Sequence, residues 1–367
     1  MLIEFDGINS VSEYIKTIET LIREKQDQKY EKYVDVFHLI EGLKFELSNL
    51  TLDEDFSKEE LYRRAIKRKK LEQEIERLQI FQRNNKSNYM YNDRTNWQTN
   101  QLMKYRFFYR GHYDYKNYKL VPSVMRNGRS GNELEKEDYY YHEIKVQCAD
   151  SFNGCSHIDQ LVLMQHYDCP TRLLDVTSNP LVALFFACKN YGCKKCNTAN
   201  EGAVYIFAVP ENEVLYYDSD RAKMLSCLPR FTYEDKKELY SACITKIIKG
   251  GVFDAKNNGN IVERLYHEIK TETPSFEKKI DPVDLLSSFF VQPLKLNSRI
   301  LKQDGAFIIN GLNLDHKEVE QKIGDMVFQV IKIKDQDKIL AELDRLGINE
   351  ATLFPEVDKV ASYLKQR

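Results

Sequence analysis

The sequence predicts an α+β protein that carries an N-terminal α-helical hairpin. Segments with the 3.6-residue repeat of amphipathic helices fill the first 83 residues. From about residue 104, short aromatic or β-branched runs alternate irregularly with helical segments. That irregular order favours small mixed or antiparallel sheets with surrounding helices over a regular βαβ series. Hydrophobic residues make up 42% and charged residues 30% of the chain, which predicts a packed core rather than disorder.

The first predicted element is an amphipathic helix over residues 9–27. Ser10 and Glu13 have the spacing of a capping box, in which a hydroxyl and a carboxylate satisfy free backbone amides at a helix start. Four apolar side chains then fall on one face, namely Val11, Ile15, Ile18 and Ile22. We expect this helix to pack on the main domain.

A helical hairpin is predicted from helices over residues 30–50 and 58–83. Ser57 and Glu60 form a second capping box, and the short link at 51–56 favours an antiparallel arrangement. Residues 84–100 are polar and Asn-rich, which is typical of a linker. The chain therefore divides into residues 1–29 (N-terminal helix), 30–100 (hairpin and linker) and 101–367 (main domain).

A basic stretch on the hairpin has two interpretations. It comprises Arg63, Arg64, Lys67, Arg68, Lys69 and Lys70. The stretch could bind a nucleic-acid or protein target, or it could be a solvated helix face balanced by Glu72, Glu74 and Glu76. The net charge of −2 argues against a globally basic nucleic-acid binder.

The main domain is predicted to mix strands and helices. Strands are expected at 106–110, 202–209, 305–309 and 325–333. Helices are expected at 133–151, 158–167, 179–188, 229–250, 335–347 and 355–365.

An Arg-Gly pair ends the first of these strands and is the first candidate site. Arg110 offers a planar fork of donors to an anion, and Gly111 permits close approach of another backbone. The alternative is an arginine that pairs with a core carboxylate at the end of a strand.

The segment from His166 to Ala187 is the densest polar cluster beside an apolar run. Leu173 and Leu174 should anchor it in the core. The polar residues held in place by this anchoring would be Thr171, Arg172, Asp175, Thr177 and Ser178. Ser178 or Asn179 can cap the following helix, whose free amides suit a phosphate. Alternatively, Arg172 and Asp175 form a buried pair that fixes a loop, and His166 is structural rather than an acid, a base or a ligand.

A third candidate segment spans Ser298–Ile309. Arg299 and Gln303 lie four residues apart, so they share a face if the segment is helical. Gln303 could bind a ribose hydroxyl or an amide, or it could cap a helix. Gly305 opens an apolar strand.

Three cysteines, Cys188, Cys193 and Cys196, are spaced C-x4-C-x2-C. They are weak zinc candidates, because the second C-x2-C pair of a zinc site is missing, and we expect reduced thiols and no metal. P-loop, Rossmann, zincin and nucleophile-elbow motifs are also missing from the sequence.

We expect a cytoplasmic protein with no membrane segment. The residues from Met1 to Asp6 do not begin a secretory signal, and no run approaches the roughly 18 apolar residues of a membrane span.

These motifs resemble the FRG-domain family, which is named for a Phe/Tyr-Arg-Gly motif near its start. The matching segments are 108–111, 120–123 with Arg126, 165–167, 170–175, 179–184, 202–205, Arg299 with 303–307, and 353–355. The resemblance spans residues 105–365, and the hairpin resembles an insertion found in a subset of the family. It implies a bacterial protein and, by association, a role in phage defence or as a toxin.

The motifs are also similar to those of ADP-ribosyltransferases of the Arg-Ser-Glu class. Tyr109-Arg110-Gly111 is similar to the first motif, and Val176-Thr177-Ser178 with the helix after it is similar to the second. The third motif departs, because Gly305 stands where the catalytic Glu would be. The residues available to substitute for that Glu are Asp304, Gln303 and Asp175.

This second resemblance implies an ADP-ribosyltransferase-like fold that takes NAD as its substrate, as a transferase or a glycohydrolase. Arg110 would hold the pyrophosphate, Ser178 would brace the site and Gln303 would contact a ribose, making these three the expected catalytic residues. The expected binding residues are Gly111, His166, Thr171, Arg172, Asp175, Thr177 and Arg299. A non-enzymatic interaction module, or a nucleic-acid-binding protein that uses the basic hairpin, remains the alternative.

Overall fold

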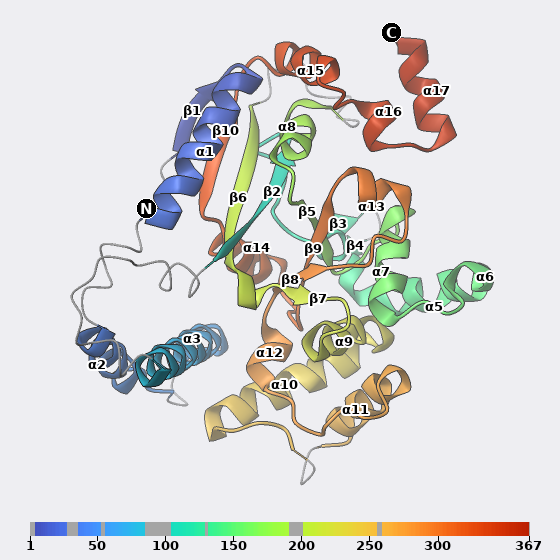
Figure 1. The fold of residues 1–367 in the computed structure, drawn as a ribbon. Coiled ribbons are helices and arrows are strands. Elements are labelled where there is room, and N and C mark those ends of the chain that lie inside the picture. Colours follow the sequence, from blue (N-terminus) through green and yellow to red (C-terminus); the bar gives the residue numbers. More distant parts are fainter. Residues whose placement is uncertain are drawn as a thin grey trace. The chain divides into compact units, whose positions relative to one another are not determined.

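The computed structural model describes residues 4–27, 36–52, 56–84, 104–128, 131–190, 201–254 and 259–366 (Figure 1). The chain forms two compact units. Unit 1 contains residues 1–21, 105–233 and 288–367, and unit 2 contains residues 22–104 and 234–287. This division differs from the three consecutive segments expected from the sequence, because residues 234–287 group with the hairpin and not with the rest of 101–367.

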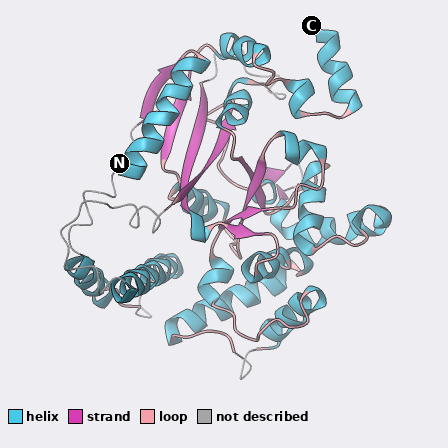
Figure 2. Ribbon diagram, viewed as in Figure 1, coloured by secondary structure: helices cyan, strands magenta, loops and turns pink. Residues whose placement is uncertain are grey.

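Unit 1 is built on one mixed sheet of eight strands in the order β1-β10-β6-β2-β5-β9-β8-β7 (Figure 2). The strands are β1 Glu4–Ile8, β10 Gln329–Ile333, β6 Gly202–Pro210, β2 Tyr105–His112, β5 Leu173–Thr177, β9 Gly305–Ile309, β8 Phe289–Gln292 and β7 Leu215–Tyr216. The outermost pairs, β1 with β10 and β7 with β8, are parallel, and the inner pairs are antiparallel. The α+β class is thus confirmed, but one large sheet replaces the several small sheets that were expected.

The sheet consists of two halves joined at a narrow point. β2 pairs with β6 along its whole length, from Tyr105 to His112. β2 and β5 share one residue pair, Tyr109 with Thr177, while β5 pairs with β9 along all five of its residues. The two halves therefore separate beyond Tyr109, and this separation creates space between β2 and β5.

Helix α8, Pro180–Cys188, packs on β2 and β6. Asn179 caps it, since its Oδ1 accepts from the Leu181 amide at 3.0 Å, and Pro180 stands in the first turn, where its missing N–H costs little. Tyr14 of helix α1, Val11–Asp27, donates its hydroxyl to the Pro180 carbonyl at 3.0 Å. The start of the N-terminal helix therefore packs on the main domain, as expected.

A hydrophobic core packs Phe108, Leu174, Phe207 and Ile308 against helix α14, His316–Gly324. Phe108 is adjacent to Tyr109 on β2, so the two side chains point to opposite faces of the sheet. The buried side chains on β2, β5 and β9 hold the backbone of these three strands in place, and these strands carry the candidate site.

The remaining elements of unit 1 surround this sheet. They are η1 Ser123–Met125, the two-stranded β3 Asn127–Gly128 and β4 Gly131–Asn132, η2 Glu133–Lys136, α5 Glu137–Gln147, α6 Ala149–Phe152, α7 His157–His166, η3 Glu211–Glu213, α9 Asp220–Ser226, η4 Leu228–Arg230, α13 Ser298–Lys302, α15 Gln336–Arg345, α16 Glu350–Leu353 and α17 Val357–Gln366.

Unit 2 is helical. Its elements are α2 Val36–Ser48, α3 Lys58–Asn84, α10 Tyr233–Lys249, α11 Asn260–Glu272 and α12 Pro282–Leu286. The hairpin core contains Ile40, Ile75 and Leu78, which confirms the predicted pairing of the first two helices. Lys69 on α3 pairs with Asp281 (Nζ–Oδ2 2.8 Å) and with Asp284, and so anchors the hairpin to α12. The predicted linker falls almost wholly outside the described residues.

Candidate functional site

A pocket of about 430 Å³ lies in unit 1 where β2 and β5 separate. Its walls come from β2, β5, β9, α7, α8 and α13, and its volume is within the range of small-molecule sites. Its polar lining residues are Arg110, Ser123, Arg126, Gln165, His166, Asp168, Asp175, Thr177, Arg299 and Gln303. Its apolar lining includes Tyr109, Val182, Phe186 and Phe307. Three guanidinium groups therefore line the pocket together with two carboxylates and several aromatic rings.

Arg110 extends from β2 towards β5, and its side chain is 15% exposed. Its Nη1 donates to the backbone carbonyl of Asp175 at 2.5 Å, and its Nε donates to Nε2 of His112 at 2.9 Å. Burial lowers the pKa of Arg110 to about 10, and the charge of Arg126 acts in the same direction while Asp175 opposes it. Arg110 therefore remains cationic at neutral pH, and its orientation is fixed by two acceptors that carry no charge.

The neutral imidazole of His112 is part of this arrangement. His112 is buried, and its pKa is held well below the ordinary value, first by burial and then by the charges of Arg110 and Arg126. A neutral ring can accept the Nε–H of Arg110, whereas a protonated ring could not. Sequence reasoning did not identify this pairing, although His112 follows the Arg-Gly pair directly.

Gly111 brings β2 and α8 into close contact. A Cβ at this position would lie 2.0 Å from the Ala183 carbonyl oxygen and 2.6 Å from the Ala187 amide nitrogen. Only glycine fits such an approach of strand and helix backbones. The close approach predicted for Gly111 is thus made to a helix of the same unit.

Asp175 lies on β5 beside Arg110 and is 63% exposed. Its Oδ2 stands 3.9 Å from Nη1 of Arg110, so its carboxylate is a loose partner rather than a core ion pair. Arg126, which follows η1, donates its Nη2 to the Val121 carbonyl at 3.0 Å and also lines the pocket. Sequence reasoning noted Arg126 only as part of a family motif and did not include it in the site.

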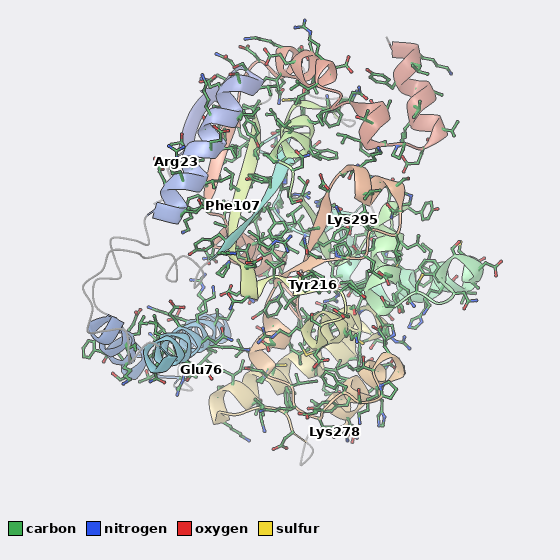
Figure 3. All side chains as sticks on the ribbon, in the orientation of Figure 1. Arg23, Glu76, Phe107, Tyr216, Lys278 and Lys295 are labelled. Carbon is green, nitrogen blue, oxygen red and sulfur yellow. The ribbon has the colours of Figure 1, made fainter. Side chains whose placement is uncertain are left out.

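Hydrogen bonds connect the second candidate segment, at Thr177 and Ser178, to the third, at Gln303 and Asp304. Thr177 donates its hydroxyl to the Gln303 carbonyl at 2.6 Å and accepts the Asn179 amide at 3.0 Å. Ser178 is exposed, donates to the Asp304 carbonyl at 3.4 Å and is not among the lining residues of the pocket. Asp304 has a positive φ of 47° and pairs with Lys295, labelled in Figure 3, at 3.0 Å. The structure therefore brings Arg110 and Gln303 to one pocket and leaves Ser178 at its margin.

Arg299 and Gln303 reach the pocket from α13 and the turn after it. The guanidinium of Arg299 lies over the ring of Phe354, 4.7 Å from its centroid, and Nε2 of Gln303 donates to the Leu353 carbonyl at 3.1 Å. His166 lines the same pocket from the end of α7, with Nε2 3.8 Å from Oε1 of Glu356. The segment from Leu353 to Glu356 therefore contacts Arg299, Gln303 and His166, which all line the pocket.

Arg172 and Thr171 do not line the pocket. Arg172 is 1% exposed and makes a two-point ion pair with the equally buried Glu137, with Nε–Oε1 at 2.9 Å. Its Nη1 also donates to the carbonyls of Asn310 and Gly311, at 3.1 and 3.3 Å. The expected alternative of an Arg172–Asp175 pair is wrong, because the carboxylate that pairs with Arg172 is the buried one of Glu137, whereas Asp175 is exposed beside Arg110.

Thr171 is also buried, and its hydroxyl donates to Gln165. Its amide donates to Oγ of Ser123 at 3.0 Å, and Ser123 in turn donates to the Thr171 carbonyl at 3.2 Å. Thr171 therefore holds two lining residues, Ser123 and Gln165, without lining the pocket itself.

The cysteine candidates give no metal centre within the described ranges. Cys188 is buried on α8, and burial raises the pKa of its thiol far above the ordinary value. Cys193 and Cys196 lie outside the described residues. Where the structure describes the chain, no three His, Cys, Asp or Glu side chains are placed to hold a metal ion.

The basic stretch of the hairpin is largely paired with carboxylates inside unit 2. Arg64 pairs with Glu60 at 2.8 Å, Arg68 with Glu72 at 3.1 Å and Lys67 with Glu46 at 2.6 Å. Lys69 is bound to α12, as described above. This pairing favours the interpretation as a balanced helix face over a phosphate-binding face.

The fold and the pocket define an α+β protein with a cationic site at a split in its sheet. Comparison with protein families then identifies the chain as carrying an FRG domain, whose family model matches residues 105–195. The match runs from β2 through α8, so it includes Arg110, Arg126 and Asp175 and excludes Arg299 and Gln303. No curated protein and no solved structure gives a significant match. Across the described ranges, no helix combines the length and apolar character needed to span a membrane.

Proposed function

We propose that unit 1, which carries the FRG domain, binds a nucleotide with a diphosphate group in this pocket, with NAD as the ligand. The observation that supports this is the convergence of Arg110, Arg126 and Arg299 on a pocket whose described lining holds two carboxylates, Asp168 and Asp175. Three guanidinium groups against two carboxylates give the lining a surplus of positive charge, which favours an anionic ligand.

The expected roles follow from the contacts. Arg110 uses Nε and Nη1 on His112 and Asp175, so its remaining N–H groups are available to a phosphate oxygen. Arg126 supplies a second guanidinium near the same carboxylate. Because a diphosphate carries charge on two adjacent groups, it can bridge both arginines. The rings of Tyr109 and Phe186 offer apolar surface to a base.

An enzymatic role would be the breaking of the bond between nicotinamide and C1′ of its ribose. Nicotinamide would leave with the bonding electron pair, and water or a target side chain would add at C1′ after losing a proton. The ADP-ribosyltransferase-like resemblance places a glutamate at Gly305 for this step, and Gly305 has no side chain to supply it. Asp175 is the carboxylate on the neighbouring strand β5, and we propose that it stabilises the cationic ribose instead.

Calorimetric titration of the full chain with NAD, ADP and adenosine tests the binding proposal. We expect ADP to bind at least about tenfold more tightly than adenosine, since two charged hydrogen bonds are added. Arg110→Gln and Arg126→Gln should each remove most of that difference. Arg106→Gln is the matched control, because Arg106 lies on the same strand but does not line the pocket.

Equal affinity for ADP and adenosine, or no binding of either, would refute the proposal. Turnover is measured separately by incubating the protein with labelled NAD, with and without cell lysate, and following nicotinamide release and labelled protein. Binding without turnover would identify a non-enzymatic nucleotide-binding module and would remove only the catalytic part.

A further inference from the structure

The C-terminal segment Glu350–Glu356 contacts the pocket from a region outside the matched family segment. It contains α16 and the residues after it, and belongs to the same unit as the pocket. Glu350 pairs with Lys189, just after α8, at 2.8 Å, which ties the segment to the helix that forms one wall. The sequence Leu353-Phe354-Pro355 was noted only as a family motif, and neither the fold class nor the proposed function assigns it a role.

Phe354 lies between two residues that line the pocket. Its ring is 4.7 Å from the guanidinium carbon of Arg299, and it meets the ring of Phe186 edge to face, with centroids 6.0 Å apart and an interplanar angle of 84°. Phe354 is itself 6% exposed, so its position is fixed by packing. Phe354 therefore holds the Arg299 side chain against one fixed surface.

This contact orients a charge without neutralising it. The face of an aromatic ring attracts a guanidinium through its quadrupole and leaves the N–H groups at the edge free to donate. Within the described parts of the chain, no carboxylate pairs with Arg299. Arg299 is therefore held in place with its donors available to an anion.

Leu353 orients the neighbouring amide in a similar way. Its carbonyl accepts Nε2–H of Gln303 at 3.1 Å, while the backbone carbonyl of Gln303 accepts the Thr177 hydroxyl at 2.6 Å. One N–H of Nε2 is engaged by this carbonyl, so Oε1 and the second N–H of Gln303 remain for a ligand. An oxygen in this position accepts a hydrogen bond, so it selects a donor such as a hydroxyl.

We propose that Leu353 and Phe354 are positioning residues that hold Gln303 and Arg299, so that this side of the pocket recognises a phosphorylated ribose. Arg299 provides the contact to phosphate, and Oε1 of Gln303 accepts from a ribose hydroxyl. The inference rests on the proposed nucleotide-binding function. It specifies that Arg299 and Gln303 bind the phosphate and the ribose of the nucleotide.

The test compares three variants of the full chain with ADP-ribose as the probe. Phe354→Leu keeps an apolar side chain but removes the ring, and we expect affinity to fall by about three- to tenfold, the range of a partly desolvated cation–π contact. Phe354→Tyr restores the ring and should bind as the wild type does. Phe276→Leu is the matched control, because Phe276 is similarly buried, packs on Tyr266 and does not line the pocket.

A second measurement needs no ligand. In protein labelled with ¹⁵N-arginine, the Nε–H signal of Arg299, assigned with Arg299→Lys, should carry an upfield ring-current shift. The shift should persist in Phe354→Tyr and disappear in Phe354→Leu. If Phe354→Leu does not fold, Phe354→Met replaces it, since methionine fills the volume with little strain.

The outcomes separate the two proposals. A wild-type protein that binds ADP-ribose while Phe354→Leu binds it equally well overturns the positioning role alone. An Arg299 signal unmoved by Phe354→Leu has the same effect. A wild-type protein that binds neither ADP nor ADP-ribose overturns the proposed function and this inference with it.

Discussion

Arg110 donates to the backbone carbonyl of Asp175 and not to its carboxylate: Nη1 lies 2.5 Å from the carbonyl oxygen and 3.9 Å from Oδ2. The contact forms just beyond Tyr109 and Thr177, the one residue pair that joins β2 to β5. The Arg110 guanidinium thus donates to β5 at a position where, in a continuous sheet, a backbone amide of β2 would donate. The charge of Asp175 remains free to influence a ligand, which leads to the first prediction.

Asp175→Asn should separate binding from catalysis. The substitution keeps the backbone carbonyl that orients Arg110 and removes one negative charge from the pocket. We expect affinity for ADP to rise about two- to fivefold because repulsion of the diphosphate is reduced. Nicotinamide release from NAD should be lost. Asp168→Asn is the matched control, since Asp168 also lines the pocket and asparagine tolerates its positive φ of 59°. Retained turnover in Asp175→Asn would assign the catalytic carboxylate elsewhere.

The buried pair of Arg172 and Glu137 should dominate a stability measurement. Glu137→Gln leaves a buried guanidinium without its counter-charge, and we expect the free energy of unfolding to fall by about 3–5 kcal/mol in urea titrations. Asp235→Asn breaks the more exposed pair with Arg264 and should cost no more than about 1 kcal/mol. Similar losses for the two variants would show that Arg172 finds another partner.

Gly111→Ala should be far more damaging than Gly305→Ala. The first places a Cβ 2.0 Å from the Ala183 carbonyl, so β2 and α8 must move apart, at a cost of about 3 kcal/mol or more. The second meets only Ile300, at an ordinary 3.4 Å. Thermal melts monitored by circular dichroism compare them. A melt of Gly111→Ala that matches the wild type would contradict the close packing of strand on helix.

His112 should make the folded state sensitive to acid. The unfolded chain takes up a proton on this residue near pH 6.5, whereas burial keeps it neutral in the folded state. Because the unfolded state then binds more protons, stability falls as pH decreases below that value, by at most about 1.4 kcal/mol per pH unit. Urea unfolding at pH 7.5, 6.0 and 5.0 should show a shallower decline for His112→Gln than for the wild type. His267→Gln, at an exposed position, should follow the wild type.

Local patterns in the sequence predicted most elements of the fold. The capping boxes at Ser10 and Ser57 mark the starts of α1 and α3, and the strand expected at 305–309 is β9 with the same bounds. The strand expected at 325–333 begins only at Gln329, because α14 reaches Gly324 and its C-terminal turn follows. These signals succeed because capping and periodicity act over a few residues.

Shorter or less regular elements were missed for the same reason. β5 reads Leu-Leu-Asp-Val-Thr, which does not alternate cleanly, since Leu173 and Leu174 are both buried on opposite faces of the sheet. β8 is four residues long. Such segments become strands through their neighbours in the sheet, and that information is not local.

Partners that are distant in sequence could not be predicted. The motifs indicated that Arg110, Ser178 and Gln303 belong together, and two of them, Arg110 and Gln303, line the pocket. The pairing of Arg172 with Glu137, 35 residues earlier, depends on which carboxylate the fold delivers to the core. The contact of Phe354 with Arg299 is likewise a product of topology, so a motif could mark those residues without assigning their roles.

The single residue pair between β2 and β5 has a mechanical consequence. Two strands that pair along their whole length resist sliding through many backbone hydrogen bonds. Here, one residue pair and the Arg110 side chain connect β2 to β5, and so connect the two four-stranded halves of the sheet. A molecule that binds both Arg110 on β2 and Gln303, which lies just before β9, would connect the two halves. Occupancy of the pocket should therefore slow amide hydrogen exchange in β5 and β9, well beyond the residues that the molecule touches.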